Sequence, residues 1–172
     1  MNNGSSKEKI GSNKSNSKEF DTILKICLII GIIIISGFII YFVLKPEPGF
    51  VTFGILNENQ EAENYPTQAS VNETISFYMT VDNYLDKVFN FNIKIKKGDN
   101  TTVLSSTGSN GTLQYMINSS INHKEKWVSN KLNISFSQIG ANQIIIAELW
   151  QNFVSKPEEF YNILWLRLNI TS

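Results

Sequence analysis

The strongest constraint on this chain is an uncharged apolar run near its N-terminus. Nineteen residues, Ile26 to Leu44 (ICLIIGIIIISGFIIYFVL), lie between Lys25 and Lys45 without a charged side chain. As a helix that rises roughly 1.5 Å per residue, this run spans about 28 Å, close to the ~30 Å hydrocarbon core of a bilayer. A helix also pairs its backbone polar groups internally, as lipid requires. We therefore predict a transmembrane helix over residues 25–45.

Two other interpretations of this run are a buried helix of a soluble protein and a cleaved signal peptide. A soluble helix normally keeps a polar face, which the run lacks. A signal peptide has a shorter apolar core followed by a small-residue cleavage site. Here the apolar core begins only after residue 25 and is followed by KPEPGF. We expect the segment to stay in the protein as an anchor.

The lysines predict the orientation of this anchor. Between Lys45 and Lys87 the chain has no basic residue, whereas five lysines precede the run: Lys7, Lys9, Lys14, Lys18 and Lys25. Because positively charged residues resist translocation, the N-terminus is predicted to be cytoplasmic and residues 46–172 extracytoplasmic.

Charge and composition differ between the two parts. Residues 1–45 carry six lysines against three acidic side chains, and residues 46–172 carry nine basic against twelve acidic ones. The outer part therefore lacks the basic field that nucleic acids require, and we expect no such partner. The polar head, residues 1–24, has too few apolar side chains for a core and is predicted to be disordered. The outer part contains no cysteine, so it depends on a hydrophobic core without disulfides.

The outer part shows the alternation of β-strands. Residues 74–82 (TISFYMTVD) place apolar and polar side chains at alternate positions, and residues 88–100 (VFNFNIKIKKGDN) repeat the pattern. This period predicts half-buried strands. Turn-forming residues separate further predicted strands at 50–56, 102–105, 112–118, 131–137, 142–150 and 160–170. Several short strands without an amphipathic helix predict a mainly β chain with an antiparallel β-sandwich.

The last predicted strand carries the most conspicuous aromatic residue. Its core face is predicted to contain Leu164, Leu166, Leu168 and Ile170, which places Trp165 on the opposite face. An outward tryptophan is either a binding contact or a side chain covered by a neighbouring loop. Since large aromatic side chains are seldom left exposed, we expect the second.

Residues 49–83 (GFVTFGILNENQEAENYPTQASVNETISFYMTVDN) resemble the start of the extracytoplasmic domain of an archaeal membrane-protein family of unknown function 1616. The similarity lies in an opening strand, the segment Tyr65-Pro66-Thr67 and a strand that ends at Asn83. Later segments of the family's domain are similar to residues 121–127, 136–150 and 159–170. The resemblance implies an archaeal envelope protein with an immunoglobulin-like outer domain, and it implies no ligand, reaction or cofactor. Many family members have several membrane spans, whereas one is predicted here.

Asparagine-linked glycosylation is the predicted modification of the outer part. Six Asn-x-Ser/Thr sequons lie there, at Asn72, Asn100, Asn110, Asn118, Asn133 and Asn169. We expect some of them to carry glycan, although the richness in asparagine alone also produces such matches. The sequons at Asn3 and Asn13 fall in the predicted cytoplasmic head and are expected to stay unmodified.

The sequence offers little for catalysis. His123 is the single histidine, so a histidine pair or a facial triad cannot form. Two loops hold acids that could bind calcium, one with Asp82, Asn83 and Asp86 and the other with Asp99 and Asn100, but neither has an EF-hand spacing. We predict no catalytic residue, no metal site, no cofactor and no enzyme activity.

These patterns predict a single-pass membrane protein of the cell envelope whose outer β-sandwich serves binding or assembly. Expected partners are a surface-layer protein, a glycan or another membrane subunit. An alternative is a non-catalytic accessory subunit of a polytopic enzyme that processes envelope glycan or lipid, or of an archaellum-like machine, whose accessory subunits share this architecture. An enzyme in its own right ranks third.

Overall fold

The computed structural model describes residues 12–45 and 48–172. The chain divides into two compact units, residues 1–47 and 48–172. In the first, one helix, α1 (Ser12–Leu44), contains the predicted span. Its segment Lys18–Leu44 is long and apolar enough to cross a membrane, and its apolar side chains are exposed. The helix begins before Lys25, so the expectation of disorder is wrong for residues 12–24, while residues 1–11 lie outside the described residues.

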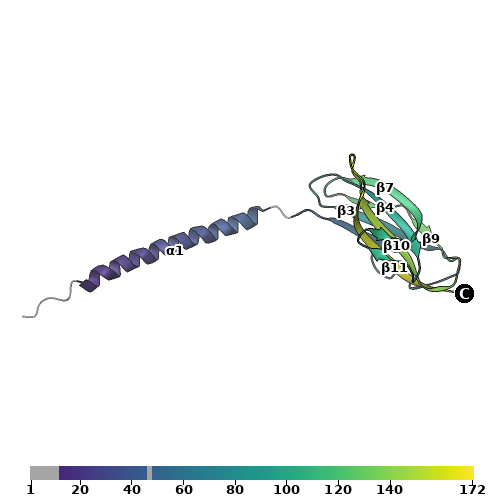
Figure 1. Cartoon of the computed structure of the whole chain (residues 1–172), viewed down its shortest axis with the longest axis horizontal. Helices are drawn as coiled ribbons and strands as arrows, with labels where there is room; N and C mark the ends of the chain where they lie inside the picture. Colours follow the sequence, from purple (N-terminus) through teal and green to yellow (C-terminus); the bar gives the residue numbers. More distant parts are fainter. Residues whose placement is uncertain (1–11, 46–47) are drawn as a thin grey trace, which may run out of the picture. The chain divides into compact units, whose positions relative to one another are not determined.

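The second unit consists of β-strands (Figure 1). Their bounds are β1 Val51–Leu56, β2 Gln68–Ser70, β3 Ile75–Asn83, β4 Phe89–Gly98, β5 Leu104–Ser105, β6 Gly108–Ser109, β7 Thr112–Ile121, β8 Lys126–Val128, β9 Leu132–Ile134, β10 Gly140–Gln151 and β11 Glu159–Thr171.

These strands form two facing sheets and a small hairpin. The smaller sheet has the order β1-β3-β8, with β9 also paired to β3, and the larger one has the order β2-β11-β10-β4-β7. All pairs are antiparallel except β2 with β11. The first stretch of the domain thus pairs in both sheets, β1 in one and β2 in the other. The predicted fold, an apolar N-terminal helix followed by an immunoglobulin-like antiparallel β-sandwich, is confirmed.

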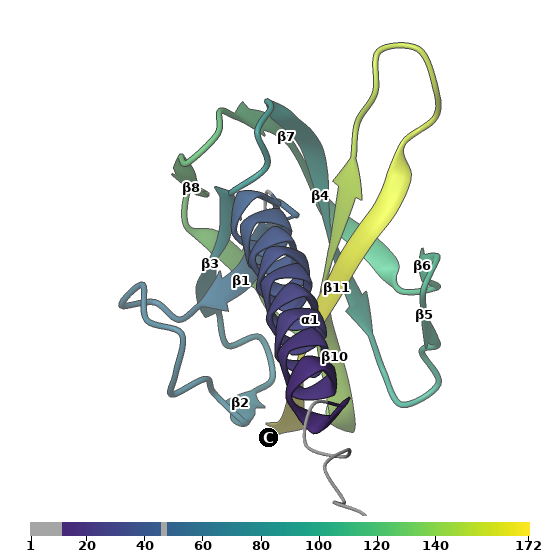
Figure 2. The ribbon, with the colours of Figure 1, turned by 90° about the vertical axis from the view of Figure 1, so that its left-hand side faces the viewer.

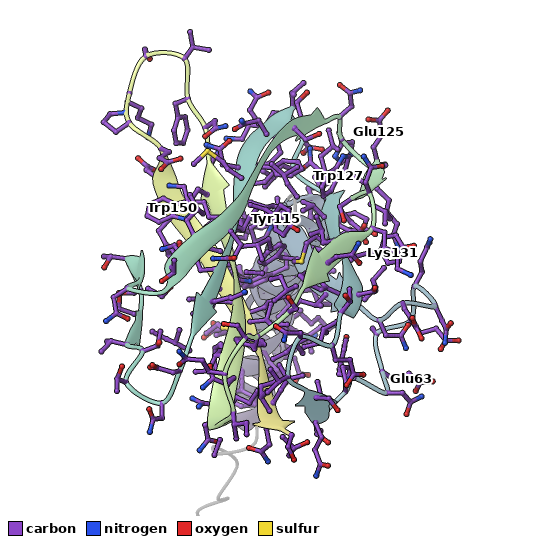
Figure 3. The ribbon with its side chains drawn as sticks, turned by 90° about the vertical axis from the view of Figure 1, so that its right-hand side faces the viewer. Glu63, Tyr115, Glu125, Trp127, Lys131 and Trp150 are labelled. Carbon is purple, nitrogen blue, oxygen red and sulfur yellow. The ribbon has the colours of Figure 1, made fainter. Side chains whose placement is uncertain are left out.

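The core lies between the two sheets and follows the predicted alternation. The strand β3 buries Phe77, Met79 and Val81, and the facing strand β4 buries Phe89, Phe91, Ile93 and Ile95. The side chain of Trp127, on β8, packs edge-on against Phe91 at 5.4 Å between ring centroids. In Figure 3, Trp127 lies on the side of the smaller sheet, whereas Trp150 lies beside the β10–β11 hairpin.

The central strand β10 is buried on both faces, as its Ile144–Ile146 run predicts. Residues 99–111, which include β5 and β6, cover its outer face. Figure 2 shows these two strands on the side of the large sheet, away from β1 and β3. A Cβ at Gly111 would lie 2.8 Å from the carbonyl oxygen of Lys97 and 2.9 Å from Cδ1 of Ile146, so this close approach of two backbone segments requires glycine.

The strand predictions are correct for the long elements and incomplete for the short ones. Every predicted segment contains a strand. Two of these strands are shorter than predicted: Leu104–Ser105 within residues 102–105, and Leu132–Ile134 within residues 131–137. The strands β2, β6 and β8 were not predicted. Each has two or three residues, which is too short for an alternating pattern to show.

Candidate binding groove

A groove of about 380 Å³ opens between β1 of the smaller sheet and β11 of the larger sheet. We call it the β1–β11 groove. Its lining is largely apolar and comes from three segments: Phe53, Gly54 and Ile55 of β1, Ala62 and Tyr65 of the following loop, and Leu164, Trp165 and Leu166 of β11. An open apolar groove at the side of a sandwich is a candidate binding site.

The loop over one end of the groove, residues 57–67, is organised by the buried side chain of Asn57. Its Oδ1 accepts hydrogen bonds from the N–H groups of Asn59 and Glu61, at 2.9 and 3.0 Å, and its Nδ2 donates to the carbonyl of Glu63. A short polar side chain that bonds nearby backbone groups in this way holds a turn. Figure 3 shows Glu63 itself pointing outward from the loop.

Tyr65 fastens this loop to β1. Its hydroxyl donates a 2.7 Å hydrogen bond to the carbonyl oxygen of Ile55. Burial raises the pKa of Tyr65 above its ordinary value, so the phenol stays protonated and able to donate. The aromatic ring also packs against the core, and the loop therefore forms a fixed wall of the groove.

The edge of β11 that borders the groove is only partly paired. The strand β2 pairs with Asn169–Thr171, where Asn169 N–H donates to the Thr67 carbonyl and the Thr171 carbonyl accepts from Val71 N–H. Backbone groups alternate in direction along a strand, so those of Ile163, Trp165 and Arg167 point to the same edge. On this edge, away from β10, no described strand pairs with residues 163–167. The N–H of Ile163 donates a 2.7 Å hydrogen bond to Oδ1 of Asn162.

The edge of β1 faces the same groove. Met79 of β3 exchanges hydrogen bonds with Ser129, on the side away from β1. Ile55 lies opposite Met79 in the β1–β3 pair. Its backbone groups consequently point away from β3 and into the groove, where the Tyr65 hydroxyl satisfies the carbonyl. Two strand edges therefore border one apolar space.

The core-facing side chains of β11 are fully buried where β2 pairs with this strand and only half-buried where it does not. Leu168 and Ile170 are 1% and 2% exposed, whereas Leu164 and Leu166, on the same core face, are only half-buried. The predicted core face is thus correct in direction and incomplete in burial. Trp165 is 47% exposed, which corrects the expectation that a loop covers it. The loop 57–67 lies beside it in the groove and leaves much of the ring open to solvent.

A polar cluster occupies the outer face of the large sheet, around the fully buried Glu148. Its carboxylate accepts hydrogen bonds from Lys96 Nζ at 2.8 Å, from the N–H and Oγ of Ser109, both at 2.7 Å, and from Trp150 Nε1 at 3.0 Å. Burial alone would raise the pKa of Glu148, but these donors together hold it below its ordinary value. Oε1 accepts three of these hydrogen bonds and Oε2 accepts one, so both buried oxygens have donors, which indicates a structural role.

A second ion pair extends this cluster towards the β10–β11 hairpin. Lys94 pairs with Glu158 and lies over the ring of Trp150, 4.2 Å from its centroid. Asn92 also donates to Glu158, at 2.9 Å. Glu159 instead pairs with Lys156, so the two adjacent glutamates diverge.

The loop acids considered for calcium are used in local structure. Asn83 is fully buried, donates to the carbonyls of Lys87 and Ile121 and accepts from Leu85 N–H, so its oxygen is not free for a metal. Asp99 accepts from the hydroxyl and N–H of Thr101, which lower its pKa. Within the described residues no group of three or more His, Cys, Asp and Glu side chains could hold a metal ion.

His123 lies in the turn between β7 and β8. Its Nδ1 contacts the carbonyl oxygen of Leu85, and its Nε2 lies 3.4 Å from Asp86 Oδ1. The nearest groups to the ring are thus a backbone oxygen and an exposed carboxylate. This arrangement ties two neighbouring turns together.

The structure exposes all six predicted glycosylation sites of the outer part. Asn72 and Asn100 lie in turns, Asn110 follows β6, and Asn118, Asn133 and Asn169 lie on strands with exposed side chains. They are spread over the domain and form no common site. Their modification stays a prediction.

Sequence patterns identified only part of the groove. They singled out Trp165 and the leucines beside it, because the last strand alternates clearly. They did not connect these residues with Phe53, Ala62 or Tyr65, which are about a hundred positions away and meet β11 only through the sandwich topology. Tyr65 belongs to the segment Tyr65-Pro66-Thr67, which contributes to the family resemblance. No pattern in the neighbouring sequence indicated that its hydroxyl contacts Ile55.

No family model and no curated protein matches the chain, so the resemblance to family 1616 stays a prediction. Among solved structures, the chain is similar to the CARDB domain of the PF1109 protein from Pyrococcus furiosus. The crystal structure of that domain in complex with di-metal ions shares 17% identity, covers 74% of this chain and 93% of that one, and has a TM-score of 0.47. Its solution structure shares 16% identity over 73% and 97% of the two chains, with a TM-score of 0.46.

A β-glucosidase from Listeria innocua in complex with glucose is also similar, with 9% identity over 72% of this chain and 16% of that one and a TM-score of 0.43. At these identities and TM-scores the likenesses carry no argument about function. The structural neighbours of this chain thus include an archaeal β-domain.

Proposed function

We propose that this protein is a single-pass, membrane-anchored protein of the cell envelope whose β-sandwich binds or assembles with a partner outside the cell. The observation that carries this proposal is the combination of two units in one chain. One is an exposed apolar helix long enough to span a bilayer, and the other is a β-sandwich with an open apolar groove. The helix keeps the sandwich at the membrane, and the groove offers the partner a surface.

The proposed orientation places α1 across the membrane with its N-terminus in the cytoplasm. The support is the distribution of lysines, five before the apolar run and none between Lys45 and Lys87. With this orientation the six exposed sequons would meet an oligosaccharyltransferase outside the cell.

The role that we propose is non-catalytic. The acidic residues that are buried or clustered take part in structural hydrogen bonds, and Glu148 is the clearest case. The groove is apolar and bordered by two strand edges, which suits a protein partner better than a glycan, since glycans need converging polar groups. The proposed origin, an archaeal envelope family related to family 1616, belongs to the same proposal.

Cross-linking in the native membrane, followed by mass spectrometry, tests this role. Cross-links from residues 48–172 to surface-layer, filament or other envelope proteins would support it. Cross-links from the same residues to cytosolic proteins would overturn the orientation. Absence of any partner from the outer domain, with efficient cross-linking of a known envelope complex in the same sample, would overturn the binding role.

A second candidate is an accessory subunit of a polytopic envelope enzyme. A single membrane span where related proteins are expected to have several favours it, because the missing helices could belong to another chain. Recovery of a polytopic enzyme in the same cross-linking experiment would select this candidate over a structural envelope role.

A further inference from the structure

We propose that the β1–β11 groove binds an extended segment of a partner protein, which adds as a strand to the free edge of β11. This inference rests on the proposed function, since it names the class of partner and the way in which it binds. Strand addition obtains its affinity from main-chain hydrogen bonds and its specificity from alternate side chains. Both features are present in the groove.

The main-chain part is the row of backbone groups along β11. The chain itself uses the end of this row, because Thr67 and Val71 bond to Asn169 and Thr171. The same row continues through Arg167 and Trp165 to the carbonyl oxygen of Ile163, whose N–H already donates to Oδ1 of Asn162. No described strand lies on this edge there. A strand can therefore continue the line that β2 begins. Between residues 163 and 167 the edge has no proline and no bulge, and its one charged side chain is Arg167.

The side-chain part is the incomplete core under this edge. Leu168 and Ile170 are covered where β2 pairs, whereas Leu164 and Leu166 remain half-buried where it does not. A segment with apolar residues at every second position would cover these two leucines and Phe53, and would complete the core. Its intervening side chains would lie beside Trp165 and Arg167 on the outer face, so an acidic or neutral residue suits the position opposite Arg167.

Two other occupants fit the groove less well. A lipid chain would cover the leucines but would leave the backbone groups of β11 unpaired. A folded surface that rests on this open groove would likewise leave the backbone groups of β11 unpaired. An extended strand satisfies the backbone groups and the apolar floor together.

A series of single photo-cross-links along β11, which we call the ladder, tests the proposal on the full chain in its native membrane. A photoreactive p-benzoylphenylalanine is placed singly at Ile163, Trp165 and Arg167, and at Gln114 and Met116 on β7, the opposite edge strand of the same sheet. Strand addition predicts that the three β11 positions react with one partner segment at residues spaced by two, in consecutive order. Scattered products, no product from β11 or a ladder from β7 would overturn it.

Substitutions then separate strand pairing from simple proximity. Trp165→Pro removes one N–H that points to the free edge and leaves the β10 pairing intact, because that N–H has no partner in β10. With the photoreactive group at Arg167, the yield of cross-linked partner should fall about tenfold below that of Trp165→Ala, which lacks the same ring but keeps the N–H, as for the loss of one hydrogen bond. A yield equal to that of Trp165→Ala, with an unchanged unfolding transition, would contradict strand addition.

A second pair of variants tests the groove without altering a strand. Ala62→Trp fills the groove from the loop 57–67, whereas Glu63→Trp places the same side chain outward on the same loop. Only the first should abolish the ladder. If both retain it, the groove is not the site. Envelope cross-links that persist from other surfaces of the domain would leave the proposed function standing while strand addition fails.

Discussion

Lys96 Nζ lies 2.8 Å from Oε1 of Glu148, a carboxylate that is completely buried on the outer face of the large sheet. The two residues are diagonal neighbours across the β4–β10 pair, since Lys96 lies opposite Ile146 and Glu148 lies opposite Lys94. Lys96 also donates to the carbonyl oxygen of Ser109, and Ser109 donates twice to Glu148. Residues 99–111 are therefore held against the sheet by one buried charge.

Replacing this charge should destabilise the domain. Glu148→Gln keeps the shape and removes the negative charge that Lys96 and Ser109 need. We expect a loss of about 2–3 kcal/mol in the free energy of unfolding, the range for hydrogen bonds to charged groups. Denaturant unfolding of the full chain in detergent micelles, followed by tryptophan fluorescence, measures it. The matched control is Glu158→Gln, a more exposed pair with Lys94, for which about 1 kcal/mol or less is expected.

The same carboxylate predicts a dependence on pH. The pKa of Glu148 is lowered in the folded protein from an ordinary value of 4.5. The unfolded chain therefore takes up a proton at higher pH than the folded one. The stabilisation is present above the unfolded pKa and is lost as the pH falls through the folded pKa.

Measurement of the free energy of unfolding from pH 7 to pH 3 checks this sign. The difference between the wild type and Glu148→Gln should shrink as the solution becomes more acidic. The lowered pKa values of Asp99 and Glu125 act in the same direction, but they are present in both proteins and cancel in the difference. The contribution of Glu158 cancels only in part, because the charge of Glu148 raises the pKa of Glu158 and is absent from the variant. A difference that grows on acidification would contradict the assignment.

Two leucines on one face of β11 should respond differently to truncation. Leu168→Ala removes a side chain that is 1% exposed and should cost about 3 kcal/mol. Leu166→Ala removes a half-buried side chain beside the groove and should cost about half as much in the isolated protein. Thermal or denaturant unfolding of the two variants gives the comparison. Equal losses would mean that the groove floor is as well packed as the core.

Asn83 should be a structural residue rather than a calcium ligand. Asn83→Ala leaves the carbonyls of Lys87 and Ile121 and the N–H of Leu85 without their partner, and it should cost about 3 kcal/mol. The exposed Asn90, replaced in the same way, should change stability by less than about 0.5 kcal/mol. Addition of calcium should not shift the melting temperature of the wild type; a concentration-dependent rise would revive the metal site.

The predicted topology can be read from glycosylation. Replacing the exposed Asn118 by Gln should remove one glycan mass from the protein isolated from its native membrane. Asn3→Gln should change nothing, because its sequon is predicted to face the cytoplasm. Intact-mass spectrometry of the two variants measures this. Glycan on Asn3 but on none of the six outer sites would reverse the orientation.

Local patterns determined the helix and the long strands of this protein. The apolar run of α1 and the alternation in β3 and β4 are properties of neighbouring residues, and burial of one face follows directly from them. These segments were predictable because each carries enough residues for its period to show. The start of α1 at Ser12 was not, since residues 12–19 are all polar and carry no apolar signal for a helix.

Tertiary structure alone decided the groove and the buried charge. Glu148, Lys96 and Ser109 lie on different strands, and only the pairing of β4 with β10 and the return of residues 99–111 bring them together. The strand β2 likewise has no pattern of its own and forms because the edge of β11 offers it partners. Where β2 ends, that edge stays open, and no stretch of sequence shows this, because an unpaired edge is defined by what lies beside it in space.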